Sequence, residues 1–139
     1  MKDRQNVFVT VESVQDGERT VRKYKGELFR KEASVYIRYA ETDDLNGQVR
    51  TVIRLKGGEL SVTRRGGVES EQYFAAGAVR AGRYRSAHLS FPLETKTTAL
   101  SMSEKAPGEL PMTLTWSYEL RADGRHVGRF RLRLDIQEE

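Results

Sequence analysis

Residues that could carry out acid–base or nucleophilic chemistry are sparse in this sequence. The chain has no cysteine, which excludes thiol nucleophiles, thiolate metal sites and disulfide bonds together. Its two histidines, His88 and His126, are far apart in the chain, and neither has a serine and a carboxylate around it as a catalytic triad requires. His126 falls beside a predicted turn, where we expect it to be solvated. His88 falls inside a predicted strand and is a candidate for lining a pocket. We expect a protein that is not an enzyme.

Metal ligands and phosphate-binding loops are not predicted either. Asp43 and Asp44 precede Asn46-Gly47 in a pattern that superficially resembles a calcium loop, but the later bidentate glutamate is missing, so we interpret the segment as an Asx-rich turn. The pairs Gly57-Gly58 and Gly66-Gly67 are typical of hairpin turns, because neither is followed by the helix that a phosphate-binding loop requires. The sequence therefore predicts no metal and no cofactor.

Arginine is in excess, which raises the hypothesis of RNA or other polyanion binding. The chain carries a net charge of +4, its sequence pI is about 9.5, and 17 arginines stand against 7 lysines. The planar guanidinium group suits bidentate contacts with phosphate. Two groups of outward arginines would carry this function, namely Arg80, Arg83 and Arg85 around Tyr84, and Arg129, Arg131 and Arg133 along one predicted strand.

The second arginine group also has a simpler explanation. The register predicted for the terminal hairpin places Glu119 opposite Arg129 and Thr115 opposite Arg133. Such a row is then an ordinary solvated strand face with one cross-strand ion pair, which is the interpretation that we favour. For the first group we likewise favour a solvated surface.

The elements that would position these residues are β-strands. Apolar and polar residues alternate along the whole chain, and glycine-containing turns interrupt the alternation at short intervals. The segment 75–82 consists mainly of small residues and is predicted to be a flexible loop. The segment 68–74 could be a strand or one turn of helix. We expect strands over residues 6–14, 19–29, 34–41, 48–56, 59–65, 68–74, 83–91, 93–105, 112–122 and 125–137.

Two hairpin registers follow from matching inward residues. A two-residue turn at Gly57-Gly58 pairs Lys56 with Glu59 and therefore sets the apolar Leu55 opposite Leu60. In the terminal hairpin, a three-residue loop 123–125 sets Tyr118 opposite Phe130, Trp116 opposite Leu132 and Leu114 opposite Leu134. A bulge at Val127-Gly128 would have the same effect. The apolar phase of segment 19–29 also changes after Val21, and a bulge near Arg22 or Lys23 would repair it.

Hairpin-connected strands that each have one apolar face must bury those faces together. A long meander closes readily, so we predict an all-β fold, a closed antiparallel up-and-down barrel of about eight to ten strands, with a two-sheet sandwich as the alternative. The 139 residues suit a single domain over 1–139. The start of the chain lacks an apolar signal core and no stretch is long enough for a membrane helix, so we expect a cytoplasmic protein that does not interact with membranes.

Several stretches resemble a known family. They are GELFRKEASVYIRYAET, VIRLKGGELSVTRRG with EQYFAAG, YRSAHLSFPLETKTTAL and LTWSYELRADGRHVGRFRLRLDI. In these the sequence resembles the small bacterial YwiB-like family, a domain of unknown function grouped with calycin or lipocalin-like barrels. After Tyr84 the family more usually reads Thr-Pro-Tyr-Gly, whereas this chain has Ser86-Ala87-His88-Leu89. The resemblance implies the barrel fold and no activity.

The leading functional hypothesis is therefore a non-enzymatic barrel that binds a small, partly apolar ligand in its interior or mouth. Barrels of this size hold one small ligand, and several predicted inward residues are polar or amphipathic. The alternative is a solid core that these side chains fill. A third hypothesis is a protein-interaction module, such as a homodimer through an exposed sheet edge. The candidate ligand-binding residues are Tyr39, Thr51, Gln72, His88, Trp116 and Tyr118.

Overall fold

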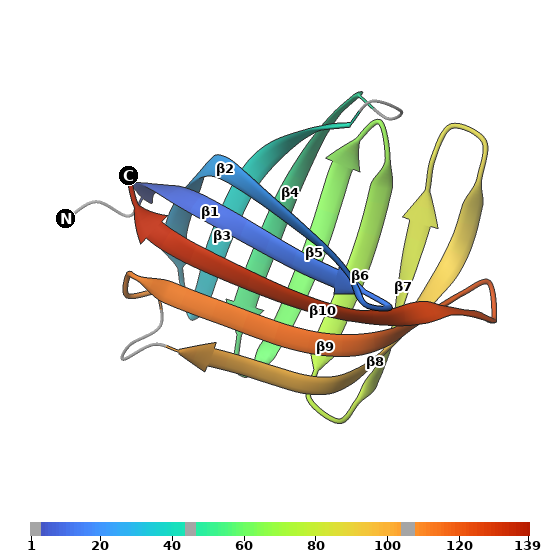
Figure 1. Cartoon of the computed structure of the whole chain (residues 1–139). Helices are drawn as coiled ribbons and strands as arrows, with labels where there is room; N and C mark the ends of the chain where they lie inside the picture. Colours follow the sequence, from blue (N-terminus) through green and yellow to red (C-terminus); the bar gives the residue numbers. More distant parts are fainter. Residues whose placement is uncertain (1–3, 44–46, 104–107) are drawn as a thin grey trace.

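The computed structural model describes residues 4–43, 47–103 and 108–139. These residues form ten strands, and Figure 1 shows how the strands wrap around a common interior. The described residues contain no helix. The strands are β1 (Arg4–Gln15), β2 (Glu18–Lys31), β3 (Ser34–Asp43), β4 (Gly47–Lys56), β5 (Glu59–Gly66), β6 (Glu69–Ala75), β7 (Val79–Arg85), β8 (Ser90–Ser103), β9 (Met112–Ala122) and β10 (Arg125–Glu138).

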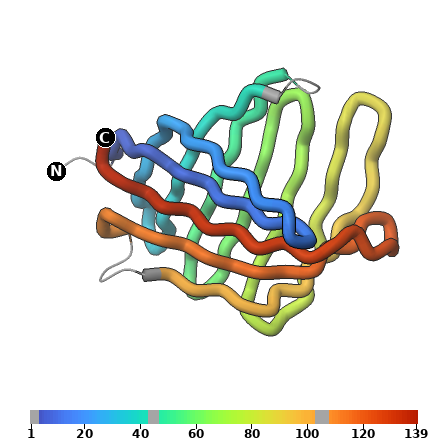
Figure 2. The backbone as a smooth tube through the Cα atoms, in the orientation of Figure 1, coloured from blue at the N-terminus to red at the C-terminus, as the bar shows by residue number. Residues whose placement is uncertain are grey.

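The sheet closes on itself as an antiparallel up-and-down barrel. Each strand pairs with its neighbours in the chain, and β1 pairs with both β2 and β10. Figure 2 shows the consequence: the first and last strands run side by side although they are the ends of the chain. Closure gives the backbone groups of the two terminal strands partners within the same sheet. The predicted antiparallel barrel is thus confirmed, and the sandwich alternative is excluded.

Both predicted hairpin registers are present. Lys56 pairs with Glu59 and Leu55 with Leu60 around the Gly57-Gly58 turn. In the terminal hairpin Tyr118 pairs with Phe130, as predicted, but the three-residue loop is wrong. The turn has two residues, and a bulge between His126 and Gly128 restores the register, which is the alternative given above.

Three sequence-based expectations about strand boundaries were wrong. The β1–β2 register runs without a break, so no bulge exists near Arg22, and Val21 is simply exposed. Residues Val79 to Gly82 belong to β7 and not to a loop. Pro92 does not separate two strands but lies inside β8, opposite Arg83. It is tolerated there because β8 pairs with β9 only from Leu93 onward, so its missing N–H leaves no gap in that ladder.

Segment 68–74, which could have been strand or helix, forms strand β6. Phe74 is buried in the core opposite Leu60, as the alternation predicts. The ladder between β6 and β7 is short and ends at the pair of Glu71 with Arg83. A Cβ atom on the next residue, Gly82, would lie 2.1 Å from the carbonyl oxygen of Glu71, so this close approach of the two strands requires glycine.

The core occupies the barrel interior and is packed unevenly along the barrel axis. Inward aliphatic side chains fill the half that contains the β4–β5 turn, and they are almost inaccessible to solvent. The other half, which contains the β1–β2 and β9–β10 turns, has larger and more polar inward residues. The buried aliphatic group includes Leu28, Val35, Ile37, Leu55, Leu60, Met112, Leu114 and Ile136.

Candidate functional site

An interior cavity of about 350 Å³ lies in the polar half of the barrel. Inward residues from eight of the ten strands line it, because every strand that crosses this half contributes alternate side chains. Its volume falls at the lower end of the range of small-molecule pockets in proteins. The polar side chains around it are Ser13, Thr20, Arg22, Glu41, Thr51, Arg64 and Gln72.

Glu41 organises the polar side of the cavity. The Tyr24 hydroxyl donates a hydrogen bond to Oε1 of Glu41 over 3.2 Å, and the Thr51 hydroxyl donates to Oε2 over 2.7 Å. Arg64 places Nη2 3.2 Å from the same Oε2 in a partly buried ion pair. Three donors from three other strands therefore hold one carboxylate at the cavity wall.

Aromatic rings form much of the remaining wall. Tyr24 and Tyr39 are stacked with ring centroids 4.8 Å apart, and Phe74 lies 4.7 Å from Tyr118 in a tilted arrangement. Tyr118 also stacks on Phe130 at 5.2 Å. Such ring contacts are favourable beyond the area that they bury, and they leave flat apolar faces available to a ligand.

The buried phenols are held in their neutral form. Burial raises the pKa of Tyr118 to about 12, although a hydrogen bond from Gln72 opposes this shift. Burial, and then the negative charge of Glu41, raise the pKa of Tyr39 above its ordinary value. At neutral pH both hydroxyls are therefore hydrogen-bonding groups and not anions.

Trp116 contributes a donor that has no partner. Its side chain lines the cavity and is 3% exposed, yet no acceptor among the described residues reaches the indole Nε1. A buried N–H without a partner costs about 1–3 kcal/mol relative to a satisfied one. Because tryptophan Nε1 can only donate, an acceptor group of a bound molecule would satisfy it.

The structure brings five of the six predicted ligand-binding residues together. Tyr39, Thr51, Gln72, Trp116 and Tyr118 all line the cavity. The prediction for His88 was wrong, because His88 is exposed in the β7–β8 turn and not inside a strand. The predicted strand 83–91 instead contains the end of β7 at Arg85, a turn over residues 86–89 and the start of β8 at Ser90.

Sequence reasoning did not select the other cavity residues, and four of these are charged or phenolic. Tyr24, Glu41 and Arg64 form the polar cluster, and Arg22 lines the cavity beside them. A signal was present, because each has the inward phase of its own strand. Arg22, for example, follows the alternation of Tyr24 and Leu28. Charged residues in an inward phase near a strand end mark the mouth of a barrel, where solvent reaches the interior.

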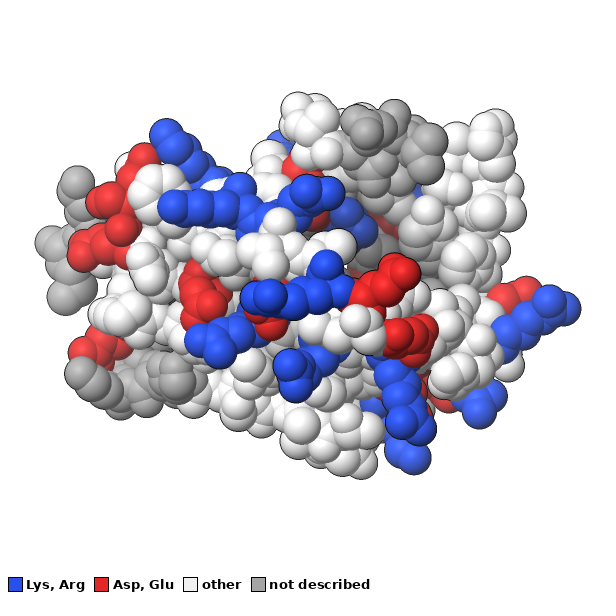
Figure 3. Space-filling model, in the orientation of Figure 1, with Lys and Arg blue, Asp and Glu red and all other residues white. Residues whose placement is uncertain are grey.

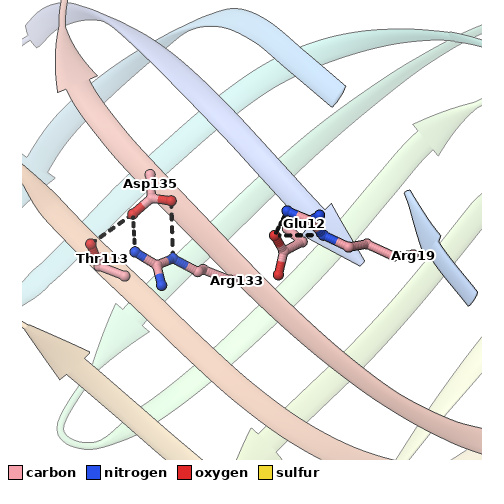
Figure 4. Close-up of polar contacts among 5 residues, drawn as sticks. All are labelled: Glu12, Arg19, Thr113, Arg133 and Asp135. Carbon is pink, nitrogen blue, oxygen red and sulfur yellow. Dashed lines mark hydrogen bonds and ion pairs between the residues drawn. The ribbon is translucent and has the colours of Figure 1, made fainter. Parts of the chain in front are cut away.

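The two arginine groups are largely neutralised by acidic neighbours. On β10, Arg129 lies 3.4 Å from Glu119, and Arg133 forms an ion pair with Asp135, whose carboxylate also accepts a hydrogen bond from Thr113 (Figure 4). Near β7, Arg80 lies 3.4 Å from Glu59, and Arg85 pairs with Glu69. Figure 3 shows basic and acidic side chains alternating over β1 and β10. Within the described residues, Arg83 and Arg131 have no ion-pair partner.

Partial burial alone would raise the pKa of Asp135, but hydrogen bonds from Arg133 and Thr113 outweigh it, so the pKa of this carboxyl lies below its ordinary value. Asp135 is therefore ionised at neutral pH and compensates Arg133. This favours the solvated-face interpretation of the β10 row.

Other kinds of site have no basis in the described part of the chain. No group of three or more His, Asp or Glu residues there is arranged to hold a metal ion. His126 is exposed at the start of β10, and Asp44 and Asn46 of the calcium-like pattern lie outside the described residues. No described helix could cross a bilayer. The pairing of β1 with β10 also leaves neither terminal strand as the exposed edge that a homodimer through a sheet edge needs.

The fold and the cavity together define a closed ten-stranded antiparallel barrel with a small polar-rimmed interior. Comparison with known proteins agrees with this class. Residues 7–134 match the model of a domain of unknown function, DUF1934, and the chain belongs to that family. The predicted family resemblance is thus confirmed.

One similar protein is the uncharacterised β-barrel protein YwiB of Bacillus subtilis strain 168. It is 32% identical over 104 residues, which are 72% of each chain. The crystal structure of the ywiB protein from Bacillus subtilis superposes with a TM-score of 0.83 and 24% identity, covering 100% of this chain and 95% of that one. The structural likeness supports the fold.

Proposed function

We propose that this barrel binds one small, partly apolar molecule in its interior cavity and catalyses no reaction. The observation that carries the proposal is the cavity of about 350 Å³, whose wall combines flat aromatic faces with a fixed carboxylate and an unpartnered indole N–H. A molecule with an apolar ring system and at least one hydrogen-bond acceptor fits this combination.

The polar cluster supports binding and not catalysis. The carboxylate of Glu41 already accepts three hydrogen bonds, so it is oriented but poorly placed to take a proton from a substrate. Both histidines are exposed and neither lines the cavity. The site therefore offers orientation and shape, with no acid–base pair of matched geometry.

A direct test uses the one tryptophan of the chain as a reporter. Trp116 lines the cavity, so a naphthalene probe bound there should quench its fluorescence by energy transfer. We expect N-phenyl-1-naphthylamine, which is neutral and apolar, to quench it saturably with one site per chain. Native mass spectrometry of the protein purified from its own host should show a retained small molecule.

A cavity-filling variant gives the matched comparison. Val62 lines the cavity between Ile53 and Gln72, so Val62→Phe should occupy the space and weaken probe binding on the order of tenfold or more. Val14→Phe, on the outer side of β1, should leave binding unchanged. Absence of saturable quenching together with absence of a retained molecule would overturn the proposal, as would equal binding by both variants.

A further inference from the structure

The positive charge of this protein is concentrated on the outer side of three adjacent strands. Between Lys23 and Phe29 on β2, and along the outward residues of β3 and β4, six residues are basic and one, Glu27, is acidic. The net charge of these seven residues is larger than the +4 of the whole chain, so the rest of the chain is net acidic. We call the six basic residues among them the basic face: Lys23, Lys25, Arg38, Arg50, Arg54 and Lys56.

The strand registers place these cations on the outer surface of three neighbouring strands. Lys25 and Lys23 follow one another along the outer side of β2, and Arg38 faces Glu27 across the β2–β3 ladder. Arg54 lies opposite Tyr36, and Arg50 opposite Ala40, across the β3–β4 ladder. All six cationic residues are exposed. Figure 3 shows the part of the basic face that turns toward the viewer, with Lys and Arg side chains gathered over β2.

Four of the six residues of the basic face have no acidic partner. Arg38 pairs with Glu27, and Lys25 lies 3.7 Å from Glu139, but Lys23, Arg50, Arg54 and Lys56 make no ion pair with any described residue. This differs from the arginine row on β10, where two of three members have acidic partners. Uncompensated cations on one face attract a polyanion, because counterions held by the polyanion are released on contact.

A groove and an aromatic pair lie within the basic face. The groove has a volume of about 630 Å³, and its lining includes the apolar Ala40 and Val52. Its charged lining residues are the basic Lys25, Arg38, Arg50 and Arg65 and the acidic Glu27 and Glu139, which are the ion-pair partners of Arg38 and Lys25.

Beside the groove, Phe29 and Tyr36 are stacked with centroids 4.9 Å apart, and the guanidinium of Arg38 lies over Phe29 at 5.5 Å. Arg54 lies over Tyr36 at 5.8 Å. Arginine planes and aromatic rings are the surfaces on which unpaired bases stack.

We propose that the basic face binds single-stranded RNA, with phosphates on the cations and bases in the groove. The apolar floor with flanking cations matches the alternation of bases and phosphates along a single strand, whereas the bases of a duplex are stacked on one another and their faces are not available to the groove. A membrane surface fits less well, because the strongly exposed large apolar side chains, Val21, Tyr73, Val79, Leu89 and Val127, lie outside this groove. This site is separate from the interior cavity.

The test measures fluorescence anisotropy of a labelled oligouridylate of about 16 nucleotides over a series of salt concentrations. We expect the logarithm of affinity to fall linearly with the logarithm of salt concentration, with a slope of roughly −0.7 for each neutralised phosphate. The variant Lys23→Gln/Arg50→Gln/Lys56→Gln should weaken binding on the order of tenfold and flatten the slope by about 2. These side chains are exposed, and the urea midpoint followed by Trp116 fluorescence should confirm that the variant is folded.

The matched control is Arg129→Gln/Arg131→Gln/Arg133→Gln, which removes the same charge from β10, a strand outside the basic face that β1 separates from β2. It should change affinity by less than about threefold, because acidic neighbours already compensate much of this row. Equal effects of the two triple variants would overturn the assignment to the basic face.

Competition experiments identify the class of partner. We expect polyglutamate and a double-stranded RNA of equal length to displace the oligouridylate only at much higher concentrations. Displacement by polyglutamate at equal concentration, or binding to phosphatidylglycerol vesicles without binding to the oligouridylate, would overturn the proposal. Loss of binding in the Val62→Phe cavity variant would also do so, because the two sites are predicted to be independent.

Discussion

The hydroxyl of Thr51 donates a hydrogen bond of 2.7 Å to Oε2 of Glu41, and this contact joins β4 to β3 at the polar wall of the cavity. Thr51 is 1% exposed, so water cannot replace it easily as a donor. Together with Tyr24 and Arg64, it keeps a charged group oriented inside a barrel. The stability of this half of the barrel therefore depends on polar contacts, because a buried charge without partners is costly.

Removing the Thr51 hydroxyl should destabilise the fold measurably. Thr51→Val keeps a similar shape but deletes one donor to a carboxylate, and we expect the free energy of unfolding to fall by about 1–2 kcal/mol. Urea denaturation followed by Trp116 fluorescence measures it. The control is Thr63→Val on the outer side of β5, which should change stability by less than about 0.5 kcal/mol. Equal effects of the two substitutions would contradict a structural role for this hydrogen bond.

The ion pair between Glu41 and Arg64 should show modest coupling. The two side chains are 22% and 33% exposed and 3.2 Å apart, so solvent screens part of their attraction. A double-mutant cycle with Glu41→Gln and Arg64→Gln should give a coupling free energy of about 0.5–1 kcal/mol that decreases with added salt. A coupling that is zero at low salt would show that the pair is only a geometric neighbour.

Alkaline pH should destabilise the protein through Tyr118. Its pKa in the folded protein is about 12, above the ordinary value of 10.0, so the folded state retains the proton while the unfolded state loses it. The stabilisation is complete below pH 10 and is lost as the pH rises toward 12, amounting to about 2–3 kcal/mol. Tyr39, whose pKa is also raised, adds to the same trend.

Urea midpoints measured across this alkaline range test the assignment. Tyr118→Phe should have a smaller decrease in stability between pH 10 and 12 than the parent protein, with Tyr39 accounting for much of the remainder. If the two proteins lose stability equally over this range, Tyr118 is not the group responsible.

Gly82 should tolerate no side chain. A Cβ atom there would lie 2.1 Å from the backbone oxygen of Glu71, and a backbone atom in a strand cannot move aside cheaply. We expect Gly82→Ala to lower the free energy of unfolding by about 1–3 kcal/mol. Ala81→Gly on the same strand should cost less, at about 0.5–1 kcal/mol. Thermal and urea unfolding of both variants would measure the difference, and a neutral Gly82→Ala would contradict the close approach of β6 and β7.

Much of the barrel could be predicted from the sequence because strand alternation is a local property. The Gly57-Gly58 turn and the facing residues Leu55 and Leu60 specify a register without any information from the rest of the chain. The same reasoning led to the Tyr118–Phe130 pairing. It could not choose between a longer loop and the bulge before Gly128, because both give the same facing residues.

Boundaries around β7 and β8 could not be predicted in the same way. Pro92 is usually a strand breaker, and it is accommodated in β8 only because the β9 ladder begins one residue later. The region 75–82 is rich in small residues, which favours a loop locally, yet it continues into a strand because β8 provides a pairing partner. In both cases long-range pairing overrides local preference.

The all-β class, the main hairpin registers and the inward orientation of the five predicted residues that line the cavity follow from the sequence alone, because each depends on an alternation of period two. Two features are visible only in the folded barrel: its interior is partly hollow, and Tyr24, Glu41, Thr51 and Arg64 meet across three strand interfaces. The folded barrel also shows that more of the cations without an ion-pair partner lie on β2 and β4 than on β10. Neither hollowness nor charge clustering can be derived from one strand at a time, because both depend on how strands distant in sequence lie beside one another after closure.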